Sequence, residues 1–320
     1  MRAMANINSR GTPSTFWAYV RITRPWNVLI IAAAMALVFQ AWIAPTLAGI
    51  AENYDGLVSV METFEITNFV LSVCVMCLLA AGGNTINDYF DVTEDAVNKP
   101  DRLIVGRLIS RRKTMAYHYV LNGLASLMSV WLSFRLSSAV PLIWCAFIGT
   151  LLSGYSPWFK RRFLRGNLII SFAVGQLPLW TLIGVLPLSH WSSMLGTLNG
   201  FGLLTYAALS AYLTFLREIT KDLQDVAGDR EAGYDTLAVR WGSNRTIHLL
   251  QILHFSGWAL LGISSWAALK WFDATWTPLL FLLPFLGAHL QLTRGLIHSV
   301  SAYQKLTLAG GLGFLAFMVG

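Results

Sequence analysis

Residues 66–95 read ITNFVLSVCVMCLLAAGGNTINDYFDVTED, and they combine the two features on which the interpretation of the chain depends. Positions 66–87 contain no Asp, Glu, Lys or Arg, and a helix that crosses a bilayer needs about 20 residues of this kind. The apolar run passes directly into Asn87, Asp88, Asp91 and Asp95. We therefore expect a membrane-spanning helix that carries a cluster of carboxylates at one end.

The composition of the whole chain is typical of a membrane protein. Of its 320 residues, 55% are hydrophobic and only 12% are charged, whereas soluble domains carry about 25% charged residues. This composition excludes an ordinary soluble enzyme and a disordered chain. The net charge of +7 is diluted in apolar sequence, so no nucleic-acid partner is expected. We predict an integral, multi-pass membrane protein.

Stretches without charged residues indicate how often the chain crosses the membrane. One of them, 166–216, is too long for a single crossing, and the turn-like Pro187-Leu188-Ser189-His190 divides it into two. The predicted fold class is therefore an all-α bundle of nine transmembrane helices, of which the ninth is short enough to be tilted or truncated. The charge-free stretches are 25–51, 66–87, 114–134, 136–159, 166–216, 246–269, 274–293 and 306–320.

The positions of the basic residues predict the orientation, because Lys and Arg mark the cytoplasmic face. With nine crossings, 21 of the 23 Lys and Arg residues fall on the side of the N-terminus, and only Arg135 and Lys270 fall on the other. We expect a cytoplasmic N-terminus and a cytoplasmic site, in the inner membrane if the source is a bacterium. The predicted organisation is one domain (1–320) with an interfacial arm (1–24) and two cytoplasmic cap loops (87–113 and 217–245).

A second acidic cluster repeats the spacing of the first. Asp222, Asp225 and Asp229 each lie 134 positions after Asp88, Asp91 and Asp95. Positions i, i+3 and i+7 share one face of a helix, so each cluster projects three carboxylates in one direction. The predicted spans that carry them are the second and the sixth, which run the same way and suggest a duplicated four-helix unit. We expect the two acidic faces to lie opposite each other.

Six converging carboxylates would repel one another unless cations lay between them. Oxygen ligands in this number favour a hard divalent cation, and Mg²⁺ is usually held by a few carboxylates together with substrate phosphates. The predicted cofactor is therefore Mg²⁺, and basic residues near both clusters indicate a diphosphate as its partner. The candidate metal ligands are Asn87, Asp88, Asp91, Asp95, Asp222, Asp225 and Asp229, and the candidate diphosphate ligands among the basic residues are Lys99, Arg102, Lys160, Arg161 and Lys221.

A metal-bound diphosphate beside an apolar helical interior suggests an isoprenoid diphosphate whose tail lies in the membrane. At this point the sequence resembles the UbiA-type intramembrane prenyltransferases over nearly its whole length. The motifs that carry the resemblance are Arg24-Pro25-Trp26-Asn27, the cluster at 87–95, Asn98-Lys99-Pro100-Asp101-Arg102, Tyr155-Ser156, Lys160-Arg161, Gly166-Asn167 and Asp222–Asp229.

The resemblance implies a nine-helix bundle over a central cavity and Mg²⁺-dependent transfer of a prenyl group from a polyprenyl diphosphate. It implies that Asp88, Asp91, Asp222, Asp225 and Tyr155 are the catalytic residues. It also implies that Asn84 joins the diphosphate ligands and that Arg24 and Asn27 bind the acceptor. Leu216-Arg217-Glu218-Ile219 with Gly228-Asp229-Arg230 is similar to the branch that attaches a geranylgeranyl group to geranylgeranylglyceryl phosphate, which makes an ether lipid acceptor the expected partner.

Three alternatives remain open at the level of the sequence. The first is an aromatic acceptor, such as 4-hydroxybenzoate or a naphthoate, because Thr236-Leu237-Ala238-Val239-Arg240 is similar to the quinone-type enzymes. The second is a cation transporter that uses the carboxylates as a pathway, although transporters usually place such residues near the middle of the bilayer. The third is a lipid scaffold without catalytic activity.

Overall fold

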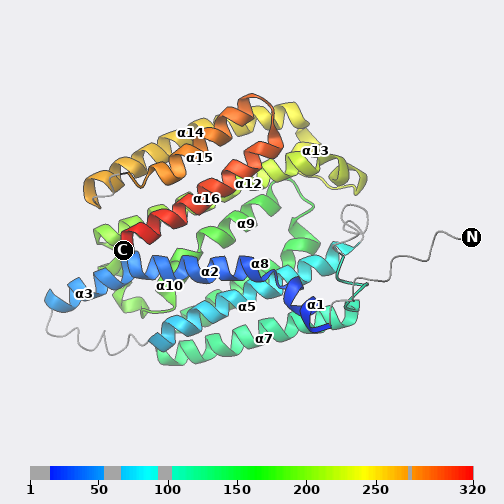
Figure 1. The fold of residues 1–320 in the computed structure, drawn as a ribbon. Helices are drawn as coiled ribbons and strands as arrows, with labels where there is room; N and C mark the ends of the chain where they lie inside the picture. The colour runs from blue at the N-terminus through cyan, green and yellow to red at the C-terminus, as the bar shows by residue number, and fades with distance from the viewer. Residues whose placement is uncertain (1–14, 54–65, 93–102, 273–275, 320) are drawn as a thin grey trace, which may run out of the picture.

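The computed structural model describes residues 15–53, 66–92, 103–272 and 276–319. In these ranges the chain is helical, and the one β-type contact is an isolated bridge between Val105 and Ile109. The long helices lie roughly side by side (Figure 1). An all-α bundle is therefore confirmed.

The first half of the bundle forms around two long helices, α5 and α7. Its apolar core joins one side of α2 to α5, α7, α8 and α10 through side chains such as Met35, Leu79 and Trp180. The elements of this half are α1 (Thr15–Ile22), α2 (Pro25–Val38), the π-helix η1 (Phe39–Ile43), α3 (Ala44–Asn53), α5 (Ile66–Phe90), α7 (Arg111–Arg135), α8 (Val140–Gly154) and the π-helix η3 (Tyr155–Phe159).

The second half packs around α12, whose apolar face meets η1, α14, α15 and α16 in a second core. A bend of 43° at Gln176 separates α9 from α10, and the break expected at 187–190 lies between α10 and α12. The elements of this half are α9 (Arg165–Gly175), α10 (Leu177–Ile183), α11 (Trp191–Leu195), α12 (Leu198–Glu231), α13 (Leu237–Trp241), α14 (Ser243–Trp271), α15 (Leu279–Thr293) and α16 (Ile297–Val319).

Several helices are longer than the charge-free stretches that predicted them. The expected ninth helix begins at Ile297 instead of 306, because Lys305 lies on an exposed face and does not end the helix. The cap loop expected over 217–245 is also mostly helical, which corrects that prediction. The polar sequence after 216 is rich in residues that favour helix, and α12 ends only shortly before Gly233, which adopts a φ of +71°.

Five helices in the described ranges are long and apolar enough to cross a membrane, or six if the bent pair α9–α10 is one crossing. They are Pro25–Ala48, Ile66–Phe90, Val140–Phe159, Ser243–Trp271 and Ile297–Val319. α7 and α12 are more polar than these and α15 is shorter, so the bundle supports a multi-pass membrane protein without establishing nine crossings. Large apolar side chains such as Phe134, Phe255 and Leu283 are exposed on the surface, as expected for helices that face lipid.

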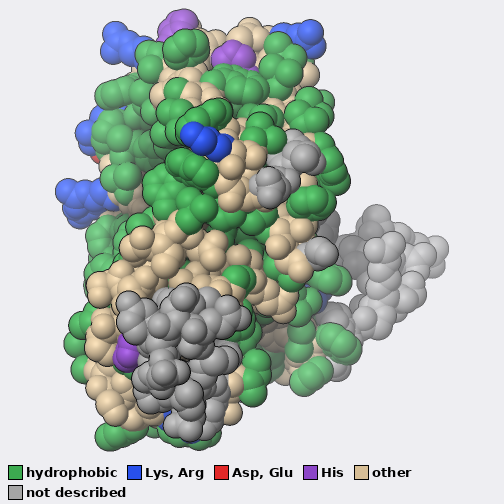
Figure 2. All heavy atoms as spheres, turned by 90° about the vertical axis from the view of Figure 1, so that its left-hand side faces the viewer, with side chains coloured by type: hydrophobic (Ala, Val, Ile, Leu, Met, Phe, Trp, Pro, Cys, Tyr) green, Lys and Arg blue, Asp and Glu red, His purple; other side chains and the backbone are tan. Residues whose placement is uncertain are grey.

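The two ends of the bundle differ in charge. The end of α5 that carries the first acidic cluster, the polar end of α12, α1 and α13 lie together at the right-hand end in Figure 1. Figure 2 looks at the opposite end, where hydrophobic and uncharged side chains cover most of the described surface and basic side chains are few. The charged groups of interest are therefore gathered at one end.

Candidate active site

The first acidic cluster lies where α5 ends, and its two described carboxylates each contact a cation. Asp88 Oδ1 accepts a hydrogen bond of 2.8 Å from the Arg24 guanidinium. Asp91 accepts one of 2.7 Å from Lys160 Nζ and one of 2.8 Å from the Asn87 side-chain amide. The Asp91 N–H donates to the Asn87 carbonyl at 2.9 Å, so the backbone continues the helical turn. Asp88 and Asp91 are therefore each paired with one of the protein's own basic groups.

The arm before α2 brings Arg24 to this position. Arg24 precedes α2 in the left-handed conformation, with a φ of 55°. The Asn84 amide donates to the Thr23 carbonyl at 2.9 Å, one helical turn before Asp88 on α5. The arm is thus held to α5 by two polar contacts, and Asn84 contacts the arm. Asn27, the other predicted acceptor ligand, is exposed in the first turn of α2.

A π-helix positions Tyr155 and Lys160 beside the first cluster. η3 follows α8 directly, and π-helical turns are often found at functional sites. The Ser156 hydroxyl donates to Asn87 Oδ1 at 2.6 Å, which joins η3 to the acidic end of α5. Gly166 packs behind this segment, since a Cβ there would lie 3.1 Å from the Lys160 Cα. The backbone at Gly166 therefore lies close to the backbone at Lys160, which directly follows η3.

The second acidic cluster lies on one face of α12, and neutral groups hold it. Asp222 accepts a hydrogen bond of 3.0 Å from the Asn167 amide, and Asp229 accepts one of 3.1 Å from the Thr236 hydroxyl. Asp225 is exposed. Within the described ranges, none of these three carboxylates forms a salt bridge.

The pKa values of two carboxyl groups in the second cluster are raised. Burial raises the pKa of Asp222 to about 7, and the negative charges of Asp229 and Glu218 add to the increase despite the hydrogen bond from Asn167. Burial also raises the pKa of Asp229, with a further contribution from the charge of Asp225. Burial is the largest cause of both shifts and the neighbouring carboxylates add to it, while the charges of Lys221 and Lys160 act in the opposite direction.

The structure brings the two clusters together at Lys160 and Tyr155. Lys160 bonds to Asp91 of the first cluster and also acts electrostatically on Asp229 of the second. Tyr155 lies within electrostatic range of Asp91, of Asp222 and of Glu218. Lys160 and Tyr155 are therefore neighbours of both clusters, which is consistent with acidic faces that lie opposite each other.

Glu218 is a member of the site to which the sequence had assigned no role. Its side chain is buried and accepts hydrogen bonds from Lys221 at 2.8 Å and from Arg217 at 3.1 Å. Its spacing, one helical turn before Asp222 in the same acidic helix, is the signal that could have identified it. Glu218 fixes the position of Lys221, one of the predicted diphosphate ligands.

Of the other predicted ligands, Arg161 lies within the described residues and three others do not. The Arg161 guanidinium lies 4.9 Å from the centre of the Tyr234 ring, so a cation–π contact holds it near the end of α12. Asp95, Lys99 and Arg102 lie outside the described residues. Their predicted roles therefore stay predictions.

The donor groups at the two clusters suit a hard divalent cation. All of them are carboxylate or amide oxygens, and neither Asp222 nor Asp229 forms a salt bridge within the described ranges. In the described ranges, no three His, Cys, Asp or Glu side chains converge closely enough to enclose an ion by themselves. Such incomplete half-sites fit Mg²⁺, which usually retains water and takes further ligands from a phosphate.

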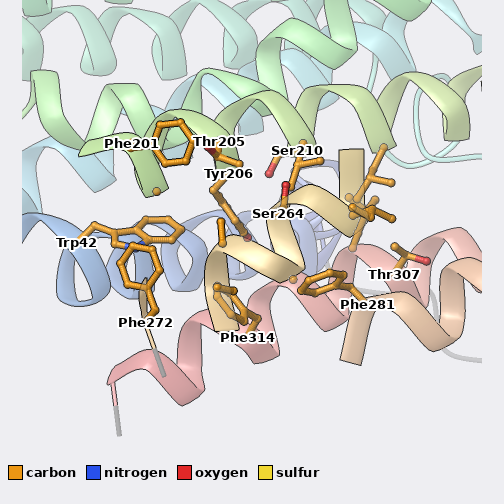
Figure 3. Close-up of a pocket in the computed structure, with 18 residues that line it drawn as sticks. Trp42, Phe201, Thr205, Tyr206, Ser210, Ser264, Phe272, Phe281, Thr307 and Phe314 are labelled. Carbon is orange, nitrogen blue, oxygen red and sulfur yellow. The ribbon is translucent and has the colours of Figure 1, made fainter. Parts of the chain in front are cut away.

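An apolar pocket of about 100 Å³ lies deeper in the bundle, between α12, α14, α16 and η1 (Figure 3). Its walls include Tyr206, Leu213, Leu261 and Phe314. Leu213 precedes Asp222 by nine residues, which corresponds to about 14 Å along the helix. Nine residues correspond to about two and a half helical turns, so the pocket lies on the face of α12 opposite to Asp222, which meets Asn167 of α9.

Comparison with known proteins identifies the family. The model of the UbiA prenyltransferase family matches residues 42–300. The digeranylgeranylglyceryl phosphate synthase of Methanothermobacter thermautotrophicus is 30% identical over 94% of this chain and 95% of its own length. That of Halobacterium salinarum is 35% identical over 53% of this chain and 55% of its own length.

Solved structures share the fold. A structure of a digeranylgeranylglyceryl phosphate synthase superimposes with a TM-score of 0.68 at 18% identity and covers 95% of this chain and 99% of its own. A UbiA homologue from Archaeoglobus fulgidus, bound to GPP and Mg²⁺, superimposes with a TM-score of 0.61 at 15% identity and covers 94% of this chain and 99% of its own. The chain belongs to the UbiA prenyltransferase family, and it is a prenyltransferase.

Proposed function

We propose that this enzyme transfers a geranylgeranyl group from its diphosphate to a hydroxyl of a geranylgeranylglyceryl phosphate acceptor, in a reaction that requires Mg²⁺. The observation that carries the proposal is that Lys160 bonds to Asp91 of the first acidic cluster and acts electrostatically on Asp229 of the second. The names of the relatives support the ether-lipid acceptor, and the ligands of the A. fulgidus homologue support the metal and the class of donor.

The residues of both clusters would hold Mg²⁺ together with the diphosphate. Asn87, Asp88 and Asp91 would act from the first cluster and Asp222 and Asp225 from the second, with Asp95 and Asp229 at their ends. Bound Mg²⁺ would neutralise charge on the departing diphosphate. Lys160 and Lys221 would bind diphosphate oxygens with charge-assisted hydrogen bonds. Lys99, Arg102, Arg161 and Asn84 are the remaining proposed ligands.

The protein groups favour a reaction that begins by ionisation of the allylic C–O bond. The electron pair of that bond leaves with the diphosphate, whose oxygens Lys160 and Lys221 stabilise. The acceptor oxygen then bonds to the allylic carbon, and its proton passes to the released diphosphate. Tyr155 lies within electrostatic range of carboxylates of both clusters, and its ring would face the allylic cation and help to exclude water.

Arg24 and Asn27 are the proposed acceptor ligands. Arg24 pairs with Asp88. If a metal ion binds Asp88, the Arg24 guanidinium would become available to bind the acceptor phosphate. The ether-lipid acceptor is preferred to an aromatic one because relatives that match 94% and 74% of the chain are digeranylgeranylglyceryl phosphate synthases.

We further propose that the chain crosses the membrane nine times with its N-terminus and its active site on the cytoplasmic side. Long helices or helix pairs occupy every predicted window in the described ranges, and the predicted cytoplasmic side carries 21 of the 23 Lys and Arg residues. Cysteine labelling of introduced sites at the two ends, in intact cells and in inverted vesicles, tests this orientation.

Transfer of a radiolabelled geranylgeranyl group in membranes that contain this protein tests the proposed function. With Mg²⁺ and geranylgeranylglyceryl phosphate we expect a doubly prenylated product that EDTA prevents. 4-Hydroxybenzoate in place of the lipid tests the aromatic alternative, and ion uptake into proteoliposomes without any diphosphate tests the transporter. Transfer to 4-hydroxybenzoate alone, or uptake without transfer, would contradict the proposal.

A further inference from the structure

A histidine lies in the interior of the first half of the bundle, where three helices meet. His118 on α7 is only 4% exposed, and its ring contacts α5 through one nitrogen and α8 through the other. α5 and α7 lie side by side (Figure 1). A polar ring at such a position costs free energy unless both of its nitrogens have partners.

One tautomer of the ring gives a partner to each nitrogen. His118 Nδ1 lies 2.9 Å from the Gly82 carbonyl oxygen of α5, and because a carbonyl oxygen can only accept, Nδ1 carries the proton in this pair. Nε2 is then an acceptor, and the Ser153 hydroxyl of α8 lies 3.4 Å from it, as in a long and weak O–H···N bond. The ring therefore connects α5 to α8 through a side chain of α7.

The next turn of α7 holds the histidine in this position. Asn122 lies one helical turn after His118, and its side-chain amide donates a hydrogen bond of 2.9 Å to the His118 carbonyl. A Cβ on Gly82 would lie only 2.6 Å from Asn122 Nδ2. Because glycine has no Cβ, α5 can approach α7 closely at the residue whose carbonyl accepts the histidine N–H.

Both partners of His118 lie close to site residues along their own helices. Gly82 precedes Asn87 by five residues, or about 7.5 Å along α5. Ser153 precedes Ser156 by three residues, and the Ser156 hydroxyl bonds directly to Asn87 at 2.6 Å. The end of α5 and the segment formed by α8 and η3 are therefore connected twice, once at the site and once through His118 nearer the middle of α5.

We propose that His118 is a positioning residue for prenyl transfer. It fixes the spacing between the end of α5, which carries Asn87 and Asp91, and η3, which carries Tyr155. The inference rests on the proposed roles of these residues in the site, and it is independent of which acceptor the enzyme uses. Since a misplacement of about 1 Å can lower a rate about 100-fold, a contact outside the site can control the rate without taking part in bond breaking.

Two substitutions separate this role from simple packing. His118→Phe keeps most of the ring volume and has no hydrogen-bonding atom, whereas His118→Asn loses volume and keeps an N–H donor near the place of Nδ1. His118→Phe should lower kcat about tenfold and leave the KM for the prenyl diphosphate within about threefold, because the diphosphate ligands remain and only their spacing changes. His118→Asn should keep kcat within about threefold of the wild type.

The two connections between α5 and η3 can also be tested against each other. Ser156→Ala removes the direct bond to Asn87, and His118→Phe removes the second connection. Because either connection can hold the spacing when the other is lost, the double variant should lower kcat by more than the product of the two single effects. Ser126→Ala, at an exposed position of α7, is the matched control and should only multiply with Ser156→Ala.

The measurement is transfer of a radiolabelled geranylgeranyl group by the purified protein with Mg²⁺, with geranylgeranylglyceryl phosphate and 4-hydroxybenzoate as separate acceptors. Thermal melting reports whether each variant is folded. If His118→Phe does not fold, Ser153→Ala takes its place in the double variant, since it removes the α8 side of the same connection.

The outcomes separate the two proposals. Wild-type kcat in His118→Phe, a slower His118→Asn than His118→Phe, or a double variant that shows only the product of the single effects overturns the role of His118 and leaves the proposed function intact. Transfer to 4-hydroxybenzoate alone overturns the proposed function, and the same ranking of variants with that acceptor would still support His118. A folded wild type that transfers to neither acceptor overturns both.

Discussion

The two acidic clusters share one spacing but differ in their neighbours. Asp88 and Asp91 on the first each contact a cation, Arg24 and Lys160 respectively. Asp222 and Asp229 on the second accept hydrogen bonds from neutral Asn167 and Thr236, and burial raises the pKa of both carboxyl groups. The described carboxylates of the first cluster are thus paired with cations, whereas those of the second cluster form no salt bridge within the described ranges.

This difference indicates an order of binding. A divalent cation gains most where carboxylates lack a partner, so the second cluster should bind it first. The first cluster becomes available when its cations move, and a diphosphate gives Lys160 and Arg24 other oxygens to bind. We therefore expect the first cluster to bind metal only together with the diphosphate.

The largest effect is expected from removing a carboxylate that would bind metal in either cluster. Asp88→Ala and Asp222→Ala should each lower the rate of transfer by about 100-fold or more, the size seen when a preorganised electrostatic group is lost. Transfer of a radiolabelled prenyl group in membranes measures this. Asp235→Ala, at an exposed carboxylate paired with Arg240 at the same end of the bundle, is the control. Full activity in either variant would remove that cluster from the catalytic site.

The order of binding itself is tested with Mn²⁺ as a paramagnetic substitute for Mg²⁺. Without diphosphate, Asp222→Asn should weaken Mn²⁺ binding by about tenfold, because it removes one carboxylate from the cluster that forms no salt bridge within the described ranges. Asp88→Asn should leave this binding unchanged. Electron paramagnetic resonance of free Mn²⁺ gives both affinities, and the reverse ranking would contradict the comparison.

Lys160 interacts with both clusters, since it bonds to Asp91 of the first and acts electrostatically on Asp229 of the second. Lys160→Gln should raise the KM for the prenyl diphosphate by about tenfold, the value of one charge-assisted hydrogen bond. Arg162→Gln is the matched control, because it removes an exposed cation two residues away. Equal effects of the two variants would show that Lys160 contributes only general positive charge.

The smallest expected effect is on the pH dependence of stability in metal-free protein. Because the pKa of Asp222 is raised to about 7 in the folded state, the folded protein retains a proton that the unfolded chain loses near pH 4. The free energy of unfolding should therefore decrease as the pH rises from about 4 to about 7. Asp222→Asn should reduce this slope, leaving the part due to Asp229. Thermal melting in EDTA at several pH values measures it, and an unchanged slope would contradict the burial of Asp222.

The sequence was sufficient to predict the all-helical fold and the side of the bundle on which the clusters lie. The i, i+3, i+7 spacing places Asp222, Asp225 and Asp229 on one face of a helix wherever that helix lies. The charge-free stretches predicted where helices occur but not where they end. A charged residue such as Lys305 can lie inside a helix when its side chain is exposed.

The partners of the carboxylates were not predictable in this way. Ser156 bonds to Asn87 and Asn167 bonds to Asp222 across 69 and 55 residues of sequence, so these contacts depend on how η3 and α9 pack. The π-helices are equally invisible to periodicity, because five residues are too few to change an apolar pattern. Glu218 had the right spacing, but its role depends on the pairing with Lys221.

The central claim is that both acidic clusters bind one diphosphate, and a structure of the protein with Mn²⁺ and a non-reactive thiodiphosphate analogue tests it most directly. We predict anomalous difference density for Mn²⁺ beside Asp88 and Asp91 and again beside Asp222 and Asp225, with a single diphosphate in contact with both. Metal density at only one cluster, or a diphosphate bound away from Asp222, would contradict the account.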